Sequence, residues 1–309
     1  MIKSSILADT RQFDQIIITE DINGHKIYLI YVETMDGLYT PLGLEFPKGE
    51  GPFPVILLAS GNGGGGMNWI IENSKNRRYT IDKILEQGYA CGWIRYRTEV
   101  ELGYNEGGKL IRDGRQGREM FNRSPLEYED EISIIEAIKQ YREIDENKIG
   151  LLGMSHAGEM ILKLTSEYHG VCAAVASEPA AHEFLALNPD DSVTINPETQ
   201  LRNIESMQMQ SANKVRERID MQVALQRINS IRTPLFIMGR DQDELQGIFR
   251  LSYELLAEQN KDVVWQSYDH DLHGFIFPLL GEDGNYVTNE VQELAIEEAL
   301  SFFGKHFAD

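Results

Sequence analysis

Positive charge is scarce in this 309-residue chain. Its 29 Lys and Arg residues stand against 49 Asp and Glu residues, which leaves a formal net charge of −20 at pH 7. Nucleic acids and anionic membrane surfaces are bound by clusters of basic side chains. We therefore expect neither a nucleic acid nor a membrane surface as a partner.

Cysteine and long apolar runs are also in short supply. The two cysteines, Cys91 and Cys172, lie in apolar stretches, and no C-x-x-C motif or zinc-like His and Cys spacing occurs. We interpret both as small buried residues rather than as a disulfide or a metal site. No run approaches the roughly 18 apolar residues of a membrane span. Residues 1–14 lack the apolar stretch of about seven residues that a secretory signal contains. These absences predict a cytoplasmic protein.

Hydrophobic residues make up 42% of the chain, which is enough for a sizeable core. Strand-like and helix-like segments alternate through most of it, a pattern typical of a largely parallel sheet with helices on both faces. Residues 13–46 differ, because turn signals at Asn23-Gly24 and Asp36-Gly37 separate three apolar strands in an antiparallel meander. Further strands are expected at 55–59, 89–96, 148–154, 171–176, 234–238 and 263–268, and helices from the glycine run to Gly88, around 132–138, and at 157–168, 244–258 and 289–304.

Two polar segments interrupt this alternation. Residues 98–124 are glycine-rich and predict a long loop. Residues 178–233 predict an insertion that is helical in its second half and carries three methionines. Methionines of this kind either cap an apolar acyl group or pack against a core. We predict one α/β domain over residues 1–309, with 178–233 as a cap or lid insertion.

The most informative segment is 149–158, which reads IGLLGMSHAG. An apolar strand leads through Ser155 directly into a predicted helix. A serine nucleophile at a strained strand-to-helix turn needs small residues two positions before and after it, because the two backbones approach closely there. Gly153 and Ala157 occupy these positions. The segment therefore predicts a nucleophile elbow.

A serine nucleophile needs a general base, and the base needs an orienting carboxylate. The strand at 234–239 is followed by Asp241 and Asp243, and the strand at 263–268 is followed by His270 and His273. The chain order serine, acid, histidine is the order used where each group follows a strand of a parallel sheet. His273 precedes a glycine in a loop that could deliver its ring to Ser155, whereas His270 suits a loop or capping role.

Three segments together resemble the α/β-hydrolase superfamily, and within it the dienelactone-hydrolase and prolyl-oligopeptidase-like branch. They are GMSHAG (153–158), FIMGRDQDEL (236–245) and HGF (273–275). The resemblance covers roughly residues 40–309. It implies an α/β-hydrolase fold in which Ser155 is the nucleophile, Asp243 the acid and His273 the base.

This sequence departs from the pattern of that superfamily at two positions. Ala157 stands where glycine is usual, and Gln242 stands where the acid is usual. Asp241 and Asp243 flank Gln242, and the Glu-Leu that follows favours Asp243. Glu178, which follows an earlier strand, occupies an alternative acid position of the superfamily.

The oxyanion donors are expected from two backbone segments. One is the N–H of His156, whose ring we interpret as a packing or hydrogen-bonding group. The other is the N–H of Asn62 or Gly63, in the glycine-rich loop at 60–66. That loop also matches G-x-G-x-x-G, the dinucleotide fingerprint. The following strand ends in arginine and tyrosine at 95–97 rather than in the acidic residue a dinucleotide site requires.

These features predict a carboxylic-ester hydrolase, a serine esterase that works through an acyl-enzyme without metal or organic cofactor. Its expected partner is a small-molecule acyl ester, and the sequence is compatible with a homodimer. A peptidase of prolyl-oligopeptidase type, a lactone hydrolase and an acyltransferase use the same three groups. A catalytically silent binding module on a hydrolase scaffold is the alternative outside enzymes.

Overall fold

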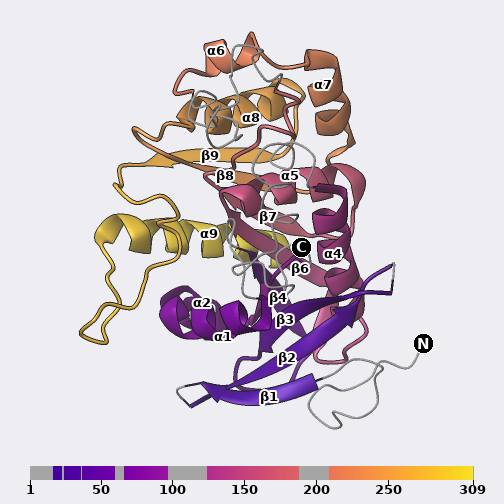
Figure 1. Cartoon of the computed structure of the whole chain (residues 1–309), viewed down its shortest axis with the longest axis vertical. Coiled ribbons are helices and arrows are strands. Elements are labelled where there is room, and N and C mark those ends of the chain that lie inside the picture. The colour runs from indigo at the N-terminus through magenta and orange to yellow at the C-terminus, as the bar shows by residue number, and fades with distance from the viewer. Residues whose placement is uncertain are drawn as a thin grey trace, which may run out of the picture.

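The computed structural model describes residues 17–22, 24–35, 37–59, 66–96, 124–187 and 209–308. The described residues form one nine-stranded sheet with the order β1-β2-β3-β5-β4-β6-β7-β8-β9 (Figure 1). The strands are β1 (Ile17–Ile22), β2 (His25–Glu33), β3 (Tyr39–Glu45), β4 (Phe53–Ala59), β5 (Ala90–Ile94), β6 (Ile144–Met154), β7 (Ala173–Ser177), β8 (Leu235–Arg240) and β9 (Val263–Tyr268).

The mode of strand pairing changes once across the sheet. The pairs β1–β2, β2–β3 and β3–β5 are antiparallel, and every pair from β5 to β9 is parallel. The predicted antiparallel N-terminal strands and mostly parallel centre are thus confirmed. Central strands such as β7 are buried at every residue, because helices cover both faces of the sheet. The last strand, β9, alternates exposed and half-buried residues along most of its length.

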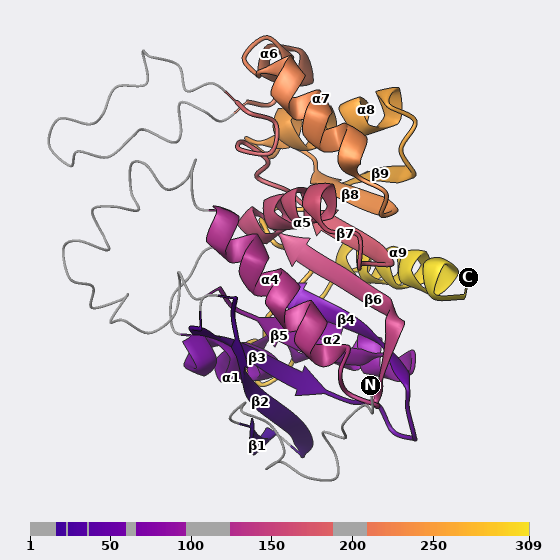
Figure 2. The same cartoon turned by 90° about the vertical axis from the view of Figure 1, so that its right-hand side faces the viewer.

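Helices divide between the two faces of the sheet, and each face has its own core. The helices are α1 (Gly66–Asn76), α2 (Arg78–Glu86), α4 (Ser124–Ile138), α5 (His156–Glu167), α6 (Ala212–Arg216), α7 (Met221–Ser230), α8 (Gln246–Glu258) and α9 (Glu290–Ala308). Buried residues of α4, α5, α7 and α8 share one apolar cluster, and those of α1, α2 and α9 share the other. Figures 1 and 2 show α1, α2 and α9 on the side of the sheet opposite α4.

The structure corrects some predicted details. The helix expected to run from the glycine run to Gly88 is two helices, interrupted at Arg77, whose φ of −119° and ψ of 27° are not helical. Cys91 is buried as predicted, but Cys172 is only half-buried, and its thiol donates a hydrogen bond to the carbonyl of His306. No helix among the described residues is long and apolar enough to cross a membrane.

The two polar segments are only partly described. Of the predicted loop at 98–124, only Ser124 is described, and it begins α4. Of the insertion at 178–233, residues 188–208 lie outside the described part of the chain. Its second half forms α6 and α7, and Met209 and Met221 pack against the core cluster of α5 and α8.

Strand order decides where functional groups meet. Because β6, β7, β8 and β9 are parallel neighbours in the sheet, their carboxyl ends lie side by side along one edge. The residues that follow these four strands include every candidate for the predicted nucleophile, acid and base. Clefts at the carboxyl ends of parallel strands are the usual place for ligands in α/β sheets.

Candidate active site

Ser155 lies at a sharp turn between β6 and α5. Its φ of 57° and ψ of −119° lie in a region that side chains other than glycine rarely adopt. The turn is tight, because a Cβ added to Gly153 would lie 3.0 Å from the carbonyl group of Ala157. A Cβ on Gly158 would lie 2.9 Å from Cα of Pro179, in the segment after β7. Alanine is therefore accommodated at position 157, whereas position 158 requires glycine.

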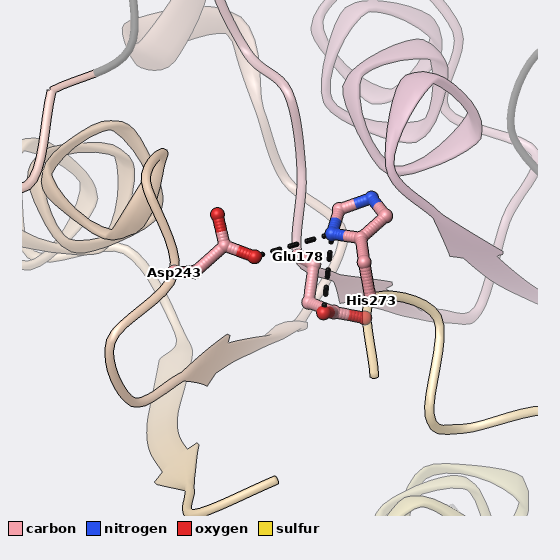
Figure 3. A group of neighbouring side chains, drawn as sticks. All are labelled: Glu178, Asp243 and His273. Atoms are coloured by element: carbon pink, nitrogen blue, oxygen red, sulfur yellow. Dashed lines mark hydrogen bonds and ion pairs between the residues drawn. The ribbon is translucent and has the colours of Figure 1, made fainter. Parts of the chain in front are cut away.

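The His273 imidazole faces two carboxylates. Its Nδ1 lies 3.2 Å from Oδ2 of Asp243 and 3.3 Å from Oε1 of Glu178 (Figure 3). Both carboxylates are buried, whereas the His273 side chain is 36% exposed. The structure thus brings the favoured acid and one of its two alternatives to the same ring nitrogen.

Asp243 is held from three directions. Its Oδ1 accepts a hydrogen bond of 2.7 Å from the backbone N–H of Leu245. Its Oδ2 accepts from the Arg240 guanidinium, at 2.6 Å from Nη2 and 3.0 Å from Nε. Burial raises the pKa of Asp243, but the hydrogen bonds from His273 and Leu245 and the nearby positive charges outweigh burial and hold that pKa below its usual value. Asp243 is accordingly ionised at neutral pH.

The competing residues have other partners. The Asp241 carboxylate accepts a hydrogen bond from the hydroxyl of Ser267 on β9. The His270 ring stacks on Phe275, and its Nδ1 accepts from the backbone N–H of Leu272 at 3.0 Å. The Asp241 side chain is therefore bonded to β9, and the His270 side chain stabilises the turn that carries His273.

The two carboxylates change the proton affinity of His273. Burial lowers its pKa, because a charged ring is poorly solvated there. The hydrogen bonds and negative charges of Asp243 and Glu178 act in the opposite direction and raise the pKa of His273 to about 9. The two carboxylates therefore favour the protonated ring, and the neutral, proton-accepting form of His273 is reached at a higher pH than in an isolated imidazole.

A direct contact joins the neighbours of Ser155 and His273. Gly274 has a φ of 80°, and a Cβ placed on it would lie 2.4 Å from the methyl carbon and 2.6 Å from the sulfur of Met154. Met154 precedes Ser155, and Gly274 follows His273. Among the described side chains, none hydrogen-bonds the Ser155 hydroxyl, which remains available to a base.

His156 contributes backbone and ring separately. As the first residue of α5, it has a backbone N–H with no acceptor inside the helix. Its Nε2 lies 2.6 Å from Oε2 of Glu127 on α4, and its Nδ1 lies 3.9 Å from Oε2 of Glu159. The ring is thus tied into the interior. The other oxyanion candidates, Asn62 and Gly63, lie outside the described residues.

No family model matches the chain, and no curated protein matches its sequence. Solved structures do match. An esterase from Pyrobaculum calidifontis superposes with a TM-score of 0.58 at 16% identity, over 91% of this chain and 86% of that one. A candidate dienelactone hydrolase from Klebsiella pneumoniae gives a TM-score of 0.54 at 12% identity, over 94% and 99%.

The chain has the α/β-hydrolase fold. Dipeptidyl peptidase 4 from Porphyromonas gingivalis shares it, with a TM-score of 0.58 at 17% identity over 91% of this chain. Only 35% of that peptidase is covered, so the chain spans about a third of its length. The fold that the three sequence motifs predicted is confirmed.

A cavity of about 760 Å³ opens beside His273 in this α/β-hydrolase fold. Its wall includes apolar side chains of the segment between β9 and α9, notably Phe275, Phe277, Leu279 and Val287. Arg77 lines another part, where its guanidinium donates to the Phe277 carbonyl at 3.1 Å. Small-molecule sites are commonly apolar hollows of about 300–1,000 Å³ with a few polar groups. The cavity borders the His273 ring, and Ser155 is not among the described residues that line it.

The same groups could be considered as metal ligands. Glu178, Asp243 and His273 each offer one ligand atom, and these atoms lie within 4.8 Å of one another. However, the Arg240 guanidinium contacts both carboxylates, at 3.2 Å and 2.6 Å. A metal ion held by them would lie beside this cation. The donor set therefore suits a hydrogen-bonded acid–base cluster better than a metal.

Arg240 stands inside the FIMGRDQDEL segment, but its role was not predicted from the sequence. A single cation that directly follows a buried apolar strand and precedes two aspartates was the available signal. Burying a carboxylate requires a partner charge or several hydrogen bonds, so an arginine at the end of β8 points to buried acids around it.

Proposed function

We propose that the protein is a serine hydrolase that cleaves carboxylic esters, with Ser155 as nucleophile, His273 as general base and Asp243 as triad acid. The observation that carries the proposal is the His273–Asp243 pair, on a loop whose Gly274 lies against Met154, the residue before the serine of a strained strand-to-helix turn. A catalytic triad is recognised by the geometry and the roles of its three groups rather than by their positions in the sequence.

The proposed reaction is a two-step acyl transfer. Neutral His273 accepts the Ser155 hydroxyl proton as the serine oxygen attacks the ester carbonyl, and Asp243 stabilises the imidazolium that forms. The imidazolium then protonates the departing alcohol, which leaves an acyl-enzyme. Water then attacks the acyl carbonyl while His273 accepts a proton from it. The imidazolium returns that proton to the serine oxygen as the acid product leaves, which restores Ser155.

The oxyanion of each tetrahedral intermediate would be bound by backbone donors. The N–H of His156 stands at the start of α5, where the helix dipole also favours negative charge. Its side chain is fixed by Glu127, which keeps the peptide in place. Asn62 or Gly63 would supply the second donor. One such donor contributes roughly 3–4 kcal/mol to transition-state stabilisation.

Two observations favour an ester over a peptide as substrate. The chain covers 86% of the esterase from Pyrobaculum calidifontis but only 35% of the dipeptidyl peptidase. The cavity beside His273 has an apolar wall suited to the apolar part of a small ester. Peptidase activity is the second candidate, because the peptidase shares the fold.

The test measures hydrolysis of p-nitrophenyl esters of increasing acyl length by wild type, Ser155→Ala and His273→Ala. We expect turnover in wild type and at most residual activity in both variants, with circular dichroism unchanged. Ser133→Ala, in α4 and away from the site, is the matched control and retains full activity. Hydrolysis that survives in Ser155→Ala would contradict the proposed nucleophile.

Two further probes separate the alternatives. A fluorophosphonate labels the serine of a working hydrolase and leaves a silent binding module unlabelled. Aminoacyl anilides that are cleaved at least as well as short esters would favour the peptidase.

A further inference from the structure

Two carboxylates converge on one nitrogen in this site. The imidazole carries a single hydrogen at Nδ1, and oxygens of Asp243 and Glu178 lie 3.2 and 3.3 Å from that nitrogen (Figure 3). A triad requires one such acid. Because the two carboxylate oxygens lie at nearly equal distances from Nδ1, both accept from the same N–H, and each contributes to holding the ring.

Glu178 is built into the fold more firmly than a surface acid. It directly follows β7, is fully buried, and has a φ of 48°. Its backbone N–H donates to the carbonyl of Met238 on β8 at 2.8 Å. Its Oε2 accepts from the backbone N–H of Gly274 at 2.7 Å. The two oxygens of Glu178 therefore hold the His273 ring and the peptide that follows it.

Arg240 connects the whole arrangement. Its Nε lies 3.2 Å from Oε1 of Glu178 and 3.0 Å from Oδ2 of Asp243. Its Nη1 donates to the carbonyls of His270 and Asp271, at 3.2 and 3.1 Å. One guanidinium thus offsets the charge of both acids and fixes the loop on which His273 sits. Two adjacent buried carboxylates would repel each other without such a cation.

We propose that Glu178 is a second acid of the triad, a positioning residue that shares the His273 Nδ1–H with Asp243, and that Arg240 holds the two acids together. The inference rests on the proposed function, because it assigns roles in the same reaction. Either acid alone then keeps the imidazole in the correct tautomer, and both must be lost before the base loses its orientation.

A consequence for pH dependence follows from the charges around the ring. His273 faces Glu178 at the end of β7 and Asp243 and Arg240 beside β8, while Asp269 and Asp271 lie on its own loop. Only the neutral imidazole accepts the Ser155 proton. Removing one anion beside Nδ1 lowers the pKa of His273. The neutral ring is then present at lower pH, so the acid limb of kcat/KM moves to lower pH. A carboxylate that held only the loop, with no oxygen near Nδ1, would change the amplitude and leave the limb in place.

The experiment measures kcat/KM from pH 5.5 to 10 for wild type, Glu178→Gln, Asp243→Asn and the double variant. We expect a wild-type acid limb near pH 9, lowered by about one pH unit or more in each single variant. Loss of a sole triad acid costs about 10⁴-fold, and we expect that loss only in the double variant. Each single variant should lose about 10–100-fold at its optimum, because the remaining acid still orients the ring.

The matched control is Glu45→Gln, which neutralises a buried glutamate that is also paired with an arginine, Arg78. Glu45 pairs with Cys91 near the start of β5, at the opposite end of that strand from the site. The acid limb of kcat/KM in Glu45→Gln should coincide with that of wild type. Equal losses in Asp243→Asn and the double variant, with an unmoved limb in Glu178→Gln, would overturn the role of Glu178.

The inference and the proposed function fail in different ways. Absence of both ester turnover and fluorophosphonate labelling in wild type would refute the proposed function. The His273 titration followed by NMR tests the shared nitrogen without any turnover. A midpoint lower in Glu178→Gln than in wild type supports the shared hydrogen bond, and identical midpoints refute it.

Discussion

The strained backbone at Ser155 gives a prediction that can be tested without a substrate. Ser155→Ala and Ser155→Gly both remove the nucleophile, but only glycine adopts a φ of 57° with a ψ of −119° at low cost. A residue held in such a conformation costs about 1–3 kcal/mol. Glycine gains more freedom than alanine on unfolding, which destabilises it by about 0.5–1 kcal/mol. The difference leaves Ser155→Gly more stable than Ser155→Ala by roughly 1 kcal/mol, and by about 2.5 kcal/mol at most.

The assay is urea unfolding of the two variants, followed by far-UV circular dichroism. The same pair of substitutions at Ser133, inside α4, serves as control. There the order reverses, because glycine in a regular helix is about 1 kcal/mol less favourable than alanine. A Ser155→Gly variant that unfolds at the same or lower urea concentration than Ser155→Ala would refute the argument that the elbow stores strain.

Three further predictions concern the turn at Ser155 and two parts of the fold outside the site. Gly153→Ala should lower the free energy of unfolding by about 1–3 kcal/mol and kcat/KM by about 10–100-fold, because its Cβ meets the first turn of α5. Gly150→Ala, whose Cβ would lie 2.7 Å from the Phe303 ring, should lose similar stability in urea titrations with kcat/KM unchanged; an equal loss of activity would contradict the elbow argument. Arg78→Met should destabilise by about 3–5 kcal/mol at pH 8, since Nη1 lies 2.5 Å from the buried Glu45 carboxylate. Burial raises the pKa of Glu45 to about 7 against the pull of Arg78, so the carboxyl is protonated at pH 5.5 and the loss there should be smaller; equal losses at both pH values would argue against an uncompensated charge. Asp220→Ala should cost about 1 kcal/mol, because its carboxylate caps α7; Asp220→Asn should restore most of that stability, and thermal unfolding compares the two.

The elements with strong hydrophobic patterns were predictable. β9 has the bounds expected from its apolar run, and α8 and α9 differ from expectation by only a few residues at their ends. The break at Arg77 was not predictable from a helix-breaking residue, because no proline or glycine lies between Gly66 and Gly88. It is decided by tertiary contacts: the Arg77 side chain bonds Asn73 and the carbonyl of Phe277, which is 200 residues away.

The site was predictable in chain order but not in its partners. Sequence placed Ser155, Asp243 and His273 after the expected strands, since parallel strands bring their carboxyl ends to one edge. It favoured Asp243 but left Asp241 and Glu178 as alternatives, because side-chain direction in a tight turn is not set by local pattern. The structure turns Asp241 toward Ser267 and turns both Asp243 and Glu178 toward His273.

The sequence by itself determined the α/β architecture, the strand-to-helix turn at Ser155 and the loops that carry His273 and the candidate acids. These depend on local periodicity, on small residues at fixed spacing and on the direction of parallel strands. Only the tertiary structure decided that two acids share His273 and that Arg240 binds both. Those contacts join the ends of β7, β8 and β9, which lie 30 to 96 residues apart along the chain, and side-chain direction at such distances depends on packing that no local pattern encodes.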